Sequence, residues 1–577
     1  MTFDRATSHI ARLFAAGTPI IGLCAAGILI RAVAPLLDDK RREPPVVAVA
    51  EDGSSVVPLI GGHHGANALA RAIAQGIGGH ASITTAGELR LGFALDEPPP
   101  GWRVANPERA KAVAAALLAD EPVALQVEAG NAEWLTASGL RFAAEAAHMI
   151  RITDRAAPTL PLRGSLPPPH AGLGWGGGDA LVLHPPVLAL GIGCERGCST
   201  GEIAALVDAT LAEHGLAAGA VAALVSLDIK MDEPALHELA ARLGVPARFF
   251  GAAELLAETP RLATPSDTVF RETGCYGVAE GAALAAVGRA GALIVPKRKS
   301  ARATCAVARA AAPLDATRIG RAQGRLAVIG IGPGDAAWRT AEADAALAGA
   351  EDIVGYGLYL DLLGAAIAGK ARHESGLGAE AERARRALDL AAAGRRVALV
   401  SSGDAGIYGL AALVLELIDR EARPEWRRIA LEIVPGVSAL QAAAARLGAP
   451  LGHDFCAISL SDLLTPWPVI ERRLVAAAEG DFVVALYNPR SERRQAQLPA
   501  AREILLAHRA PETPVALARN LGRAGESIRI ATLGALDPDD VDMLTLVLVG
   551  SSATRLVPGD PPRLYTPRGY AAKRTLT

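Results

Sequence analysis

The chain has 577 residues, of which 51% are hydrophobic and 21% are charged, and its formal net charge is -3. This length suggests three or four domains, and the composition is typical of a folded globular protein. No strongly basic segment marks a nucleic-acid-binding surface, so no nucleic-acid partner is expected.

Membrane insertion and metal binding also find little support. The apolar segment 20–30 is only about half as long as the ~20 residues of a membrane span, so we expect a buried strand and a helix there. Without a signal peptide or span, the expected location is the cytoplasm. The cysteines form no C-x-x-C pair, and no histidine cluster completes a zinc site around Cys194 and Cys198. Reduced thiols and no bound metal are expected.

Strand and helix patterns alternate through the first half of the chain. Two segments rich in proline and glycine, 92–103 and 158–179, interrupt this pattern and predict loops. Apolar runs predict strands, and 3.6-residue periodicity predicts helices. The strands are expected at 19–23, 46–49, 187–190, 221–227 and 248–250, and the helices at 67–77, 200–214 and 233–243.

The same alternation resumes after a third break at 310–324. It predicts an α/β fold made of several mostly parallel sheets with helices on their faces. The strands are expected at 326–331, 352–355, 397–401, 431–434, 482–487, 514–518 and 544–549, and the helices at 340–347 and 379–393.

A strand, a glycine-rich loop and a helix follow one another at residues 330–335 (GIGPGD). Glycines let the backbone approach a ligand closely. The spacing differs from the dinucleotide-binding pattern G-x-G-x-x-G, because a proline follows the second glycine and the third comes one position early. A tight turn without a ligand explains the motif equally well.

Three more loops of this kind follow predicted strands, at 401–409, 434–439 and 487–491. In parallel sheets, ligands bind beyond the carboxyl ends of the strands, so the four loops predict one shared site. None contains the Lys-Ser/Thr pair that grips a triphosphate, so a nucleoside triphosphate is not expected.

These loops resemble the tetrapyrrole methylase family of cobalamin and siroheme synthesis. Residues 459–467 (SLSDLLTPW), 352–359 (DIVGYGLY) and 487–491 (YNPRS) resemble the branch that methylates C17 of precorrin-3B and contracts the ring. The resemblance implies a corrin precursor as substrate, two α/β subdomains, and a homodimer formed through this half. Whether the substrate is precorrin-3B or the cobalt-containing cobalt-factor III stays open.

The resemblance also implies that S-adenosylmethionine, the methyl donor, is folded in the cleft between the two subdomains. Asp404 would face its polar amino-acid or ribose portion. Ala405 stands where many relatives have proline, which changes loop stiffness but removes no polar contact. The implied cofactor contacts are Pro333, Ser402, Gly403, Asp404, Ile407, Ser438, Ala439, Asn488 and, as a weaker match, Ala531.

Ring contraction needs acid–base help in addition to methyl transfer. Four polar residues lie near the 459–467 motif: His453, Asp454, Ser461 and Asp462. We take Asp462 as the catalytic candidate, while a role as a cap or in a turn remains equally open for each of the four.

The first half resembles a second family, the cobalt-precorrin-5A hydrolases, which release acetaldehyde by opening a lactone ring. The matching motifs of that family's C-terminal domain are 191–197, 228–233, 264–266, 273–280, 295–297 and 304–306, and those of its N-terminal region are 25–36, 61–67 and 83–86. The hydrolases usually begin with one more strand and helix, so the first unit is expected to be shortened.

Two residues of this half invite a catalytic interpretation. His63 would serve as a general base, and Lys297 would hold an acetate side chain of the substrate. A surface loop and a solvated basic patch are equally good explanations. The half is therefore either a hydrolase or a non-catalytic module that binds corrinoids.

The two resemblances divide the chain into four parts. They are a hydrolase-like N-terminal domain at 1–90, a variable middle region at 91–180, a hydrolase-like C-terminal domain at 185–310, and the methylase at 324–570. An NAD-type oxidoreductase that uses the glycine loops is the remaining, less favoured alternative.

Overall fold

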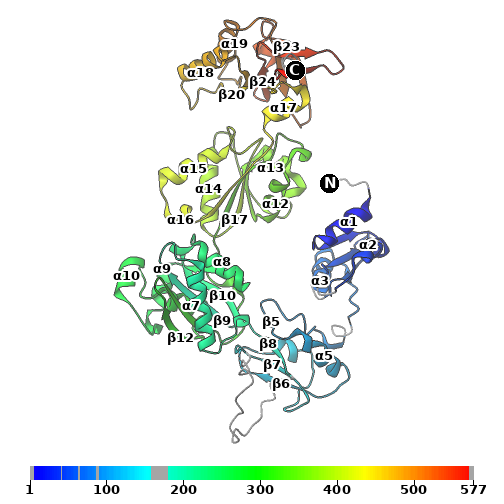
Figure 1. Cartoon of the computed structure of the whole chain (residues 1–577), viewed down its shortest axis with the longest axis vertical. Coiled ribbons are helices and arrows are strands. Elements are labelled where there is room, and N and C mark those ends of the chain that lie inside the picture. The colour runs from blue at the N-terminus through cyan, green and yellow to red at the C-terminus, as the bar shows by residue number, and fades with distance from the viewer. Residues whose placement is uncertain (1–4, 40–41, 63–64, 86–89, 157–179, 571–577) are drawn as a thin grey trace, which may run out of the picture. The chain divides into compact units, whose positions relative to one another are not determined.

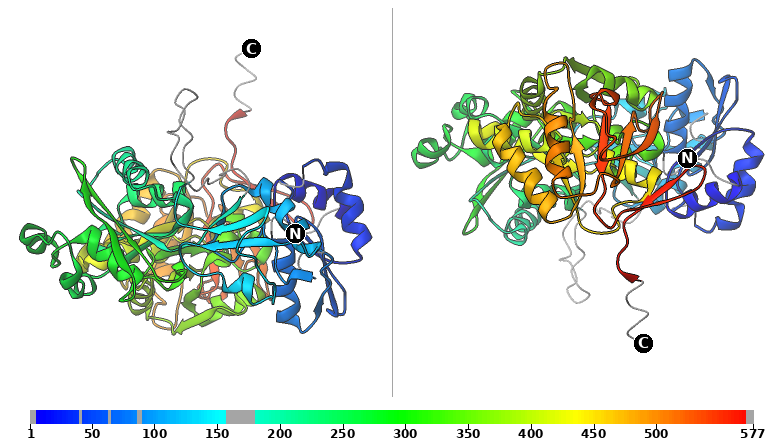
Figure 2. Two further views of the ribbon diagram at one scale, coloured as in Figure 1. Left: turned by 90° about the horizontal axis from the view of Figure 1, so that it is seen from below. Right: turned by 90° about the horizontal axis from the view of Figure 1, so that it is seen from above.

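The computed structural model describes residues 5–39, 42–62, 65–85, 90–156 and 180–570. The chain divides between Arg321 and Ala322 into two compact units, which are described separately (Figure 1). Figure 2 shows the alternation of helices and strands along the chain from two further directions. The α/β fold with mostly parallel sheets is confirmed.

The first sheet of unit 1 has the strand order β1-β2-β3-β4. The strand and the helix expected at 20–30 are present, but the strand is not fully buried. It is the edge strand of its sheet, and Ile21 and Leu23 are 56% and 66% exposed. The elements are α1 (Ala6–Ala15), β1 (Ile20–Leu23), α2 (Ala26–Val33), β2 (Val46–Val49), β3 (Ser55–Ile60), α3 (Ala66–Ile77) and β4 (His80–Ala81).

A second sheet of unit 1 has the order β5-β8-β7-β6. Its three longer strands are parallel, and short β5 pairs antiparallel with β8. Helix α5 packs its apolar side on the sheet. The elements are β5 (Arg103–Val104), α5 (Ala110–Leu118), β6 (Val123–Val127), β7 (His148–Ile152) and β8 (Ala180–His184).

The third sheet of unit 1 has the order β11-β10-β9-β13-β12. Strands β9, β10 and β11 are parallel, whereas β12 and β13 form an antiparallel hairpin beside β9. The strands are β9 (Leu188–Cys194), β10 (Val221–Leu227), β11 (Ala247–Phe250), β12 (Ala292–Lys299) and β13 (Ala303–Arg309), and the main helices are α7 (Thr200–Glu213), α8 (Pro234–Leu243) and α11 (Val278–Val287).

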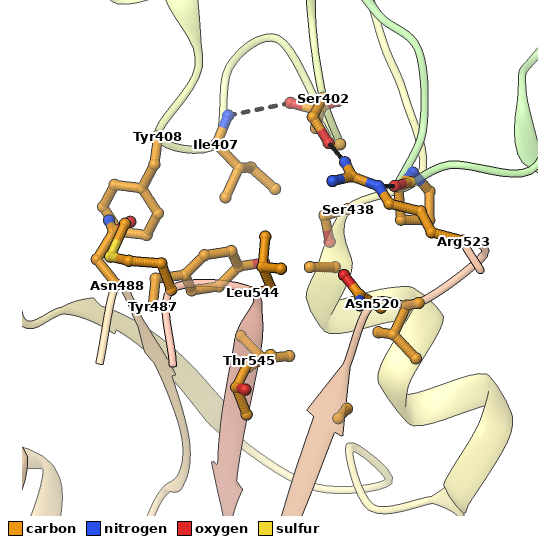
Figure 3. Close-up of a pocket in the computed structure, with 18 of the residues that line it drawn as sticks. Ser402, Ile407, Tyr408, Ser438, Tyr487, Asn488, Asn520, Arg523, Leu544 and Thr545 are labelled. Atoms are coloured by element: carbon orange, nitrogen blue, oxygen red, sulfur yellow. Dashed lines mark hydrogen bonds between the residues drawn. The ribbon is translucent and has the colours of Figure 1, made fainter. Parts of the chain in front are cut away.

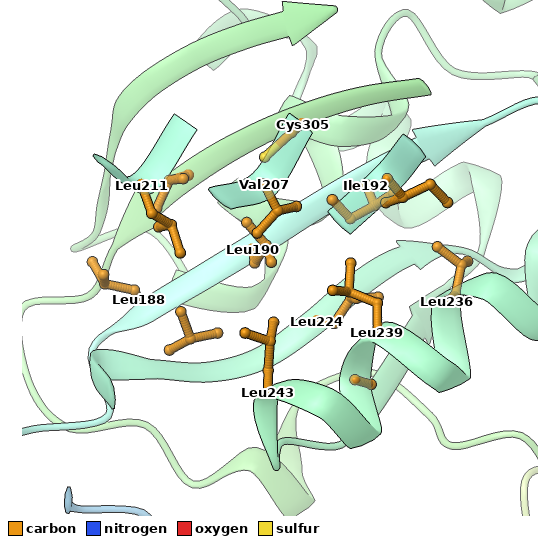
Figure 4. Packing of buried hydrophobic residues seen from close by; sticks show 14 of the residues in the cluster. Leu188, Leu190, Ile192, Val207, Leu211, Leu224, Leu236, Leu239, Leu243 and Cys305 are labelled. Carbon is orange, nitrogen blue, oxygen red and sulfur yellow. The ribbon is translucent and has the colours of Figure 1, made fainter. Parts of the chain in front are cut away.

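Helices cover both faces of this sheet because its central strand is apolar on both sides. Leu188, Leu190 and Ile192 of β9 pack against α7 and α8 (Figure 4). On the other face α11 lies directly on the strand, where a Cβ at Gly191 would overlap the carbonyl oxygen of Ala279. Glycine is therefore required there for close helix–strand packing.

The first sheet of unit 2 is entirely parallel, with the order β16-β15-β17-β14-β18. Alternate residues of β14 point to opposite faces, so Leu326 and Val328 meet α14 and α15, while Ala327 and Ile329 pack with α12 and α13. The strands are β14 (Arg325–Gly330), β15 (Asp352–Tyr356), β16 (Ala371–Ser375), β17 (Arg396–Ser401) and β18 (Ala430–Val434), and the helices are α12 (Ala341–Gly349), α13 (Gly357–Leu363), α14 (Glu380–Ala392) and α15 (Leu410–Glu421).

The second sheet of unit 2, with the order β20-β21-β24-β22-β23, differs because only β20 and β21 are parallel. Strands β22 and β23 form a hairpin, and β24 inserts antiparallel between β21 and β22. The strands are β20 (Phe455–Ser459), β21 (Val483–Tyr487), β22 (Pro514–Arg519), β23 (Ser527–Thr532) and β24 (Thr545–Val549), and the helices are α17 (Ala439–Leu447), α18 (Trp467–Glu479) and α19 (Gln497–Leu506). Short strands β19 (Gly448–Ala449), β25 (Arg555–Val557) and β26 (Arg563–Tyr565) form a third sheet.

Three further observations concern the described residues only. None of their helices has both the length and the apolar character that a membrane span requires. Their histidines, cysteines and carboxylates nowhere form a group of three that would hold a metal ion. All six cysteines are free thiols.

Candidate active site

A cavity of about 240 Å³ lies in unit 2 where loops from its two large sheets meet (Figure 3). One wall comes from the loops after β14, β17 and β18, and the other from the ends of β21 and β22 and the start of β24. All but one of the expected cofactor contacts line it. The lining members of that set are Pro333, Ser402, Gly403, Asp404, Ile407, Ser438, Ala439 and Asn488.

The loops after β14, β17 and β18 pack against one another through their backbones. Gly332 and Gly403 exchange two hydrogen bonds, N–H to O at 3.1 and 2.8 Å. A Cβ at Gly330 would lie 2.6 Å from the carbonyl oxygen of Gly403, and one at Gly436 would overlap the same oxygen. Side chains are excluded from this junction, so the loops need glycine at both positions.

Asp404 ties these loops together. Its Oδ1 accepts hydrogen bonds from the backbone N–H of Gly406 at 2.8 Å and of Ile407 at 3.1 Å, and its Oδ2 accepts one from Gly436 at 2.9 Å. Three backbone donors thus occupy the carboxylate, which gives Asp404 an organising role in the wall of the pocket. Its contact with the polar portion of a cofactor stays a prediction.

Helix α17 begins at the pocket with a capping box. The hydroxyl of Ser438 accepts from the N–H of Gln441 at 3.2 Å, and the side chain of Gln441 accepts from the N–H of Ser438 at 2.9 Å. The Tyr487 hydroxyl accepts from the N–H of Leu440 at 3.0 Å. The first turn of the helix is therefore held rigidly against the end of β21.

Three residues of the pocket wall adopt positive φ although they are not glycine. The φ values are 53° for Tyr408, 48° for Asn488 and 51° for Asn520. This conformation is unfavourable for residues with a Cβ, and tyrosine in particular rarely adopts it. Backbone strain concentrated at one cavity is a feature of functional sites.

Three tyrosines also line the cavity: Tyr359, Tyr408 and Tyr487. Burial raises the pKa of each of the three phenols. The Tyr408 hydroxyl donates to the carbonyl of Ala457 at 3.0 Å, and its ring lies 5.1 Å from that of Tyr487. The phenols therefore remain neutral near neutral pH.

Of the wall contributed by the second sheet, the sequence predictions included only the loop after β21, with Asn488. The hairpin turn Asn520-Leu521-Gly522-Arg523 follows a strand and contains glycine, so it carried the same signal as the other loops. The start of β24 carried no such signal, because its place depends on antiparallel insertion into the sheet. The lining residues that the sequence analysis did not name as cofactor contacts are Tyr359, Tyr408, Tyr487, Ala518, Asn520, Leu521, Arg523, Met543, Leu544, Thr545 and Leu546.

Ala531 does not line the cavity. It lies on the edge strand β23 opposite Val515, near the start of β22, whereas the pocket lies at the other end of that strand, around Ala518. A hairpin reverses the chain direction, so a residue late in β23 is carried away from the pocket. The structure brings Ala518 to the cavity instead.

Asp462 lies outside the cavity lining, on the exposed loop that follows β20. Its Oδ2 accepts a hydrogen bond from the side chain of Gln497 at 2.8 Å. The base of this loop is attached to the pocket, since Ser459 Oγ accepts from Asn488 Nδ2 at 3.1 Å. The tip presents Leu463 and Leu464, which are 85% and 93% exposed. A catalytic role for Asp462 stays a prediction.

In unit 1, Lys297 is half-buried and belongs to a hydrogen-bonded cluster around Glu280. Its Nζ donates to the carbonyl of Thr264 at 3.0 Å, and its N–H donates to Glu280 Oε1 at 2.8 Å. Burial, with help from the nearby charge of Lys299, lowers the pKa of Lys297. His63, the other catalytic candidate of unit 1, lies outside the described residues.

Comparison with known proteins accounts for both halves of the chain. The family model of tetrapyrrole (corrin/porphyrin) methylases matches residues 325–537. Two models of the cobalamin synthesis G protein, N-terminal and C-terminal, match residues 8–88 and 188–308. The probable cobalt-factor III C(17)-methyltransferase of Salmonella typhimurium is 49% identical over 245 residues, which are 42% of this chain and 99% of that protein.

The chain belongs to the tetrapyrrole methylase family. A precorrin-3B C(17)-methyltransferase from a Sinorhizobium species is 48% identical over 250 residues, which are 43% of this chain and 98% of the relative. The crystal structure of the methyltransferase CobJ is 44% identical and covers 42% of this chain and 100% of its own, with a TM-score of 0.40. Both resemblances stated from the sequence, that of the methylase half and that of the hydrolase-like half, are confirmed.

Proposed function

We propose that the methylase half transfers a methyl group from S-adenosylmethionine to C17 of a corrin precursor and contracts its ring. The observation that carries this proposal is one shared cavity in unit 2, which every expected cofactor contact except Ala531 lines. The identity to C17-methyltransferases over nearly their whole length supports the choice of ring position.

The residues of the cavity fit this cofactor. Gly403 lines the cavity without a side chain, so a flat adenosine can approach the backbone there. S-adenosylmethionine would supply a methyl group on a sulfonium, already activated for transfer. The protein then needs to provide orientation and a dry site rather than a strong nucleophile. Ser402, the start of α17 and Asn488 would hold the donor.

The exposed loop after β20 is suited to the substrate. A corrin precursor is a wide, largely apolar macrocycle with carboxylate side chains. Leu463 and Leu464 would lie against the macrocycle, because neighbouring leucines this exposed suit an apolar ligand. Asp462, between Ser461 and these leucines, is the proposed acid or base for ring contraction.

The test is to incubate the chain with carbon-13-labelled S-adenosylmethionine and either precorrin-3B or cobalt-factor III. We expect label at C17 of a ring-contracted product, and the better substrate decides whether cobalt is required. Asp404→Ala should abolish the product by loosening the loops after β17 and β18, which its carboxylate joins. Label on any other carbon would refute the proposed position.

An NAD-type oxidoreductase gains no support from the geometry. Such enzymes need an acidic residue at the carboxyl end of the second strand to bind the ribose. Here β15 ends at Tyr356, and its acidic residue Asp352 lies at the other end, 2.8 Å from both Arg395 Nε and His373 Nε2. Calorimetry with NADH and S-adenosylhomocysteine separates the two functions, and only the latter should bind.

For unit 1 we propose a retained hydrolase activity that opens the lactone of a corrinoid and releases acetaldehyde. The two cobalamin synthesis G models, which match most of this half, support it. A non-catalytic module that holds the intermediate is the alternative, since fusion raises effective concentration either way. The test supplies cobalt-precorrin-5A to the full chain and traps acetaldehyde. Product that disappears in His63→Ala supports the enzyme, and tight binding without acetaldehyde supports the carrier.

We further propose that the protein is cytoplasmic and forms a homodimer through the methylase half. Six free cysteines fit a reducing compartment. The edge strand β25 is exposed along its length, with Leu556 and Val557 at 50% and 44%, and such an edge favours pairing. Light scattering should give a molar mass twice that of the chain. In Leu556→Lys, the measured mass should fall to that of a single chain.

A further inference from the structure

Arg523 stands apart from the other residues of the cavity. Among the described residues that line it, Arg523 is the one lysine, arginine or histidine. It lies on the turn between β22 and β23, and its side chain reaches across to the loops after β14 and β17 (Figure 3). It therefore connects the two walls of the pocket.

The partners of its guanidinium are neutral. Nε donates to the carbonyl oxygen of Pro333 at 2.6 Å, and Nη2 donates to the hydroxyl of Ser402 at 2.8 Å. The ring of Tyr359 lies beneath it, with the centroid 5.9 Å from Cζ. Neighbouring arginines of unit 2 pair instead with carboxylates: Arg339 with Asp344, Arg446 with Glu526, and Arg519 with Asp542.

A half-buried cation whose partners are neutral is incompletely stabilised. Burial lowers the pKa of Arg523, because the charged form loses hydration inside the pocket. The group nevertheless stays protonated, since arginine does not lose its proton in proteins. Exchanging a carbonyl and a hydroxyl for a carboxylate would replace neutral hydrogen bonds by stronger charge-assisted ones.

The backbone around Arg523 is held in place while its terminal group remains free to change partners. Glu526 Oε2 accepts from the N–H of Gly522 at 2.7 Å, and Glu526 Oε1 accepts from Arg446 at 2.8 Å. Glu526 thus fixes the turn from one side. Only rotation about the side-chain bonds of Arg523 is needed to present its guanidinium to a ligand.

We propose that Arg523 is the carboxylate receptor of this pocket and exchanges Pro333 and Ser402 for a carboxylate of the bound ligand. The inference rests on the proposed function, which names two carboxylate-bearing ligands: S-adenosylmethionine and the corrin precursor. Its present partners are themselves expected cofactor contacts, so the geometry favours the amino-acid carboxylate of the cofactor. A substrate carboxylate is the second source of the same chemistry.

Calorimetry on the full chain distinguishes the sources. S-adenosylhomocysteine carries the carboxylate, and methylthioadenosine lacks the whole amino-acid portion. Arg523→Gln should weaken S-adenosylhomocysteine binding about 10- to 100-fold and leave methylthioadenosine binding unchanged. Arg523→Lys should lie between wild type and Arg523→Gln, because lysine keeps the charge but not the two-pronged geometry. Arg420→Gln, on an exposed helix and paired with Glu416, is the matched control and should change neither.

Other outcomes are equally decisive. Unchanged S-adenosylhomocysteine binding with a tenfold weaker affinity for the corrin precursor assigns the carboxylate to the substrate. Equal weakening of both adenosine ligands would make Arg523 a structural support, and no change in any ligand would also overturn the proposal. If Arg523→Gln unfolds at a lower temperature than wild type, Arg523→Lys is used instead. A weaker affinity for S-adenosylhomocysteine with an unchanged affinity for methylthioadenosine then supports the proposal, and equal losses overturn it. Wild-type protein that binds neither adenosine ligand would overturn the proposed function itself.

Discussion

The pocket of unit 2 and the Glu280 cluster of unit 1 use polar groups in opposite ways. In the pocket, the loops form hydrogen bonds with one another through their backbones and through Asp404. They leave a cavity lined by one described cation, Arg523, whose partners are neutral. In unit 1, Glu280 is 2% exposed and accepts from the N–H groups of Ala263, Thr264 and Lys297 and from the Thr264 hydroxyl.

The difference separates two roles that look alike in sequence. Both regions consist of short motifs that resemble a known family. In unit 2 the motifs surround space for a ligand, whereas around Glu280 their polar atoms are already bonded to one another. Lys297, predicted to hold an acetate of the substrate, belongs to this network through its N–H to Glu280 and its Nζ to the Thr264 carbonyl. Mutations should therefore affect ligand binding in the first region and stability in the second.

The largest effect is expected at the junction of the pocket loops. Gly436→Ala would bring a Cβ onto the carbonyl oxygen of Gly403 and within 2.5 Å of that of Gly330. The loops must then separate, and we expect S-adenosylhomocysteine affinity to fall more than about 100-fold by calorimetry. Gly349→Ala is the control, because nothing lies within 4 Å of the added carbon. Equal affinity in both variants would contradict the close packing.

In unit 1 the corresponding change should act on stability. Glu280→Gln replaces a carboxylate that accepts four hydrogen bonds, and we expect unit 1 to lose about 2–3 kcal/mol in chemical denaturation. S-adenosylhomocysteine binding should not change. Glu213→Gln removes an exposed pair with Arg298 and should alter stability by less than about 1 kcal/mol. If Glu280→Gln lost ligand binding but kept its stability, the structural role assigned to Glu280 would be wrong.

The same carboxylate predicts a pH dependence. Burial acts to raise the pKa of Glu280, but its hydrogen bonds with Lys297, Thr264 and Ala263 outweigh this and hold the pKa below its usual value. A lowered folded-state pKa means that the contribution is fully present above the unfolded value of about 4.3 and is lost as the pH falls below it. Denaturation of unit 1 below this pH should depend less steeply on pH in Glu280→Gln than in wild type.

A smaller effect distinguishes the two alanines of the hairpin. Ala518 lines the cavity and is 1% exposed, so Ala518→Val should crowd the ligand and weaken S-adenosylhomocysteine binding about tenfold. Ala531→Val, on the edge strand away from the pocket, should leave the affinity at the wild-type value. Comparable losses in the two variants would restore Ala531 as a cofactor contact.

The smallest effect is expected on the loop after β20. Replacing Leu463 and Leu464 by serine should raise the KM for the corrin precursor about threefold, since each side chain contributes apolar contact. Affinity for S-adenosylhomocysteine and thermal stability should not change, because both side chains are exposed. Leu377→Ser, at a position that is 74% exposed on another loop, is the control. A substrate KM equal to that of wild type would exclude this loop from substrate binding.

Local patterns determined much of this protein. The apolar runs located β10, β14 and β17 to within a residue or two, and the 3.6-residue periodicity located α8 and α14 equally closely. Each of these strands has both faces in a core, and each of these helices has one whole face in a core. The glycine loops likewise indicated a site at the carboxyl ends of the strands, since close backbone packing admits no other residue there.

Tertiary structure decided what depends on contacts distant in sequence. The antiparallel insertion of β24 brought Thr545 to the cavity, and the reversal of the β22–β23 hairpin moved Ala531 away from it. Likewise, only the fold shows that three backbone donors hold Asp404 and that Arg523 spans the pocket to Ser402. A sequence specifies which groups a residue carries, but their partners, and hence their remaining capacity to bind a ligand, depend on strand order and direction.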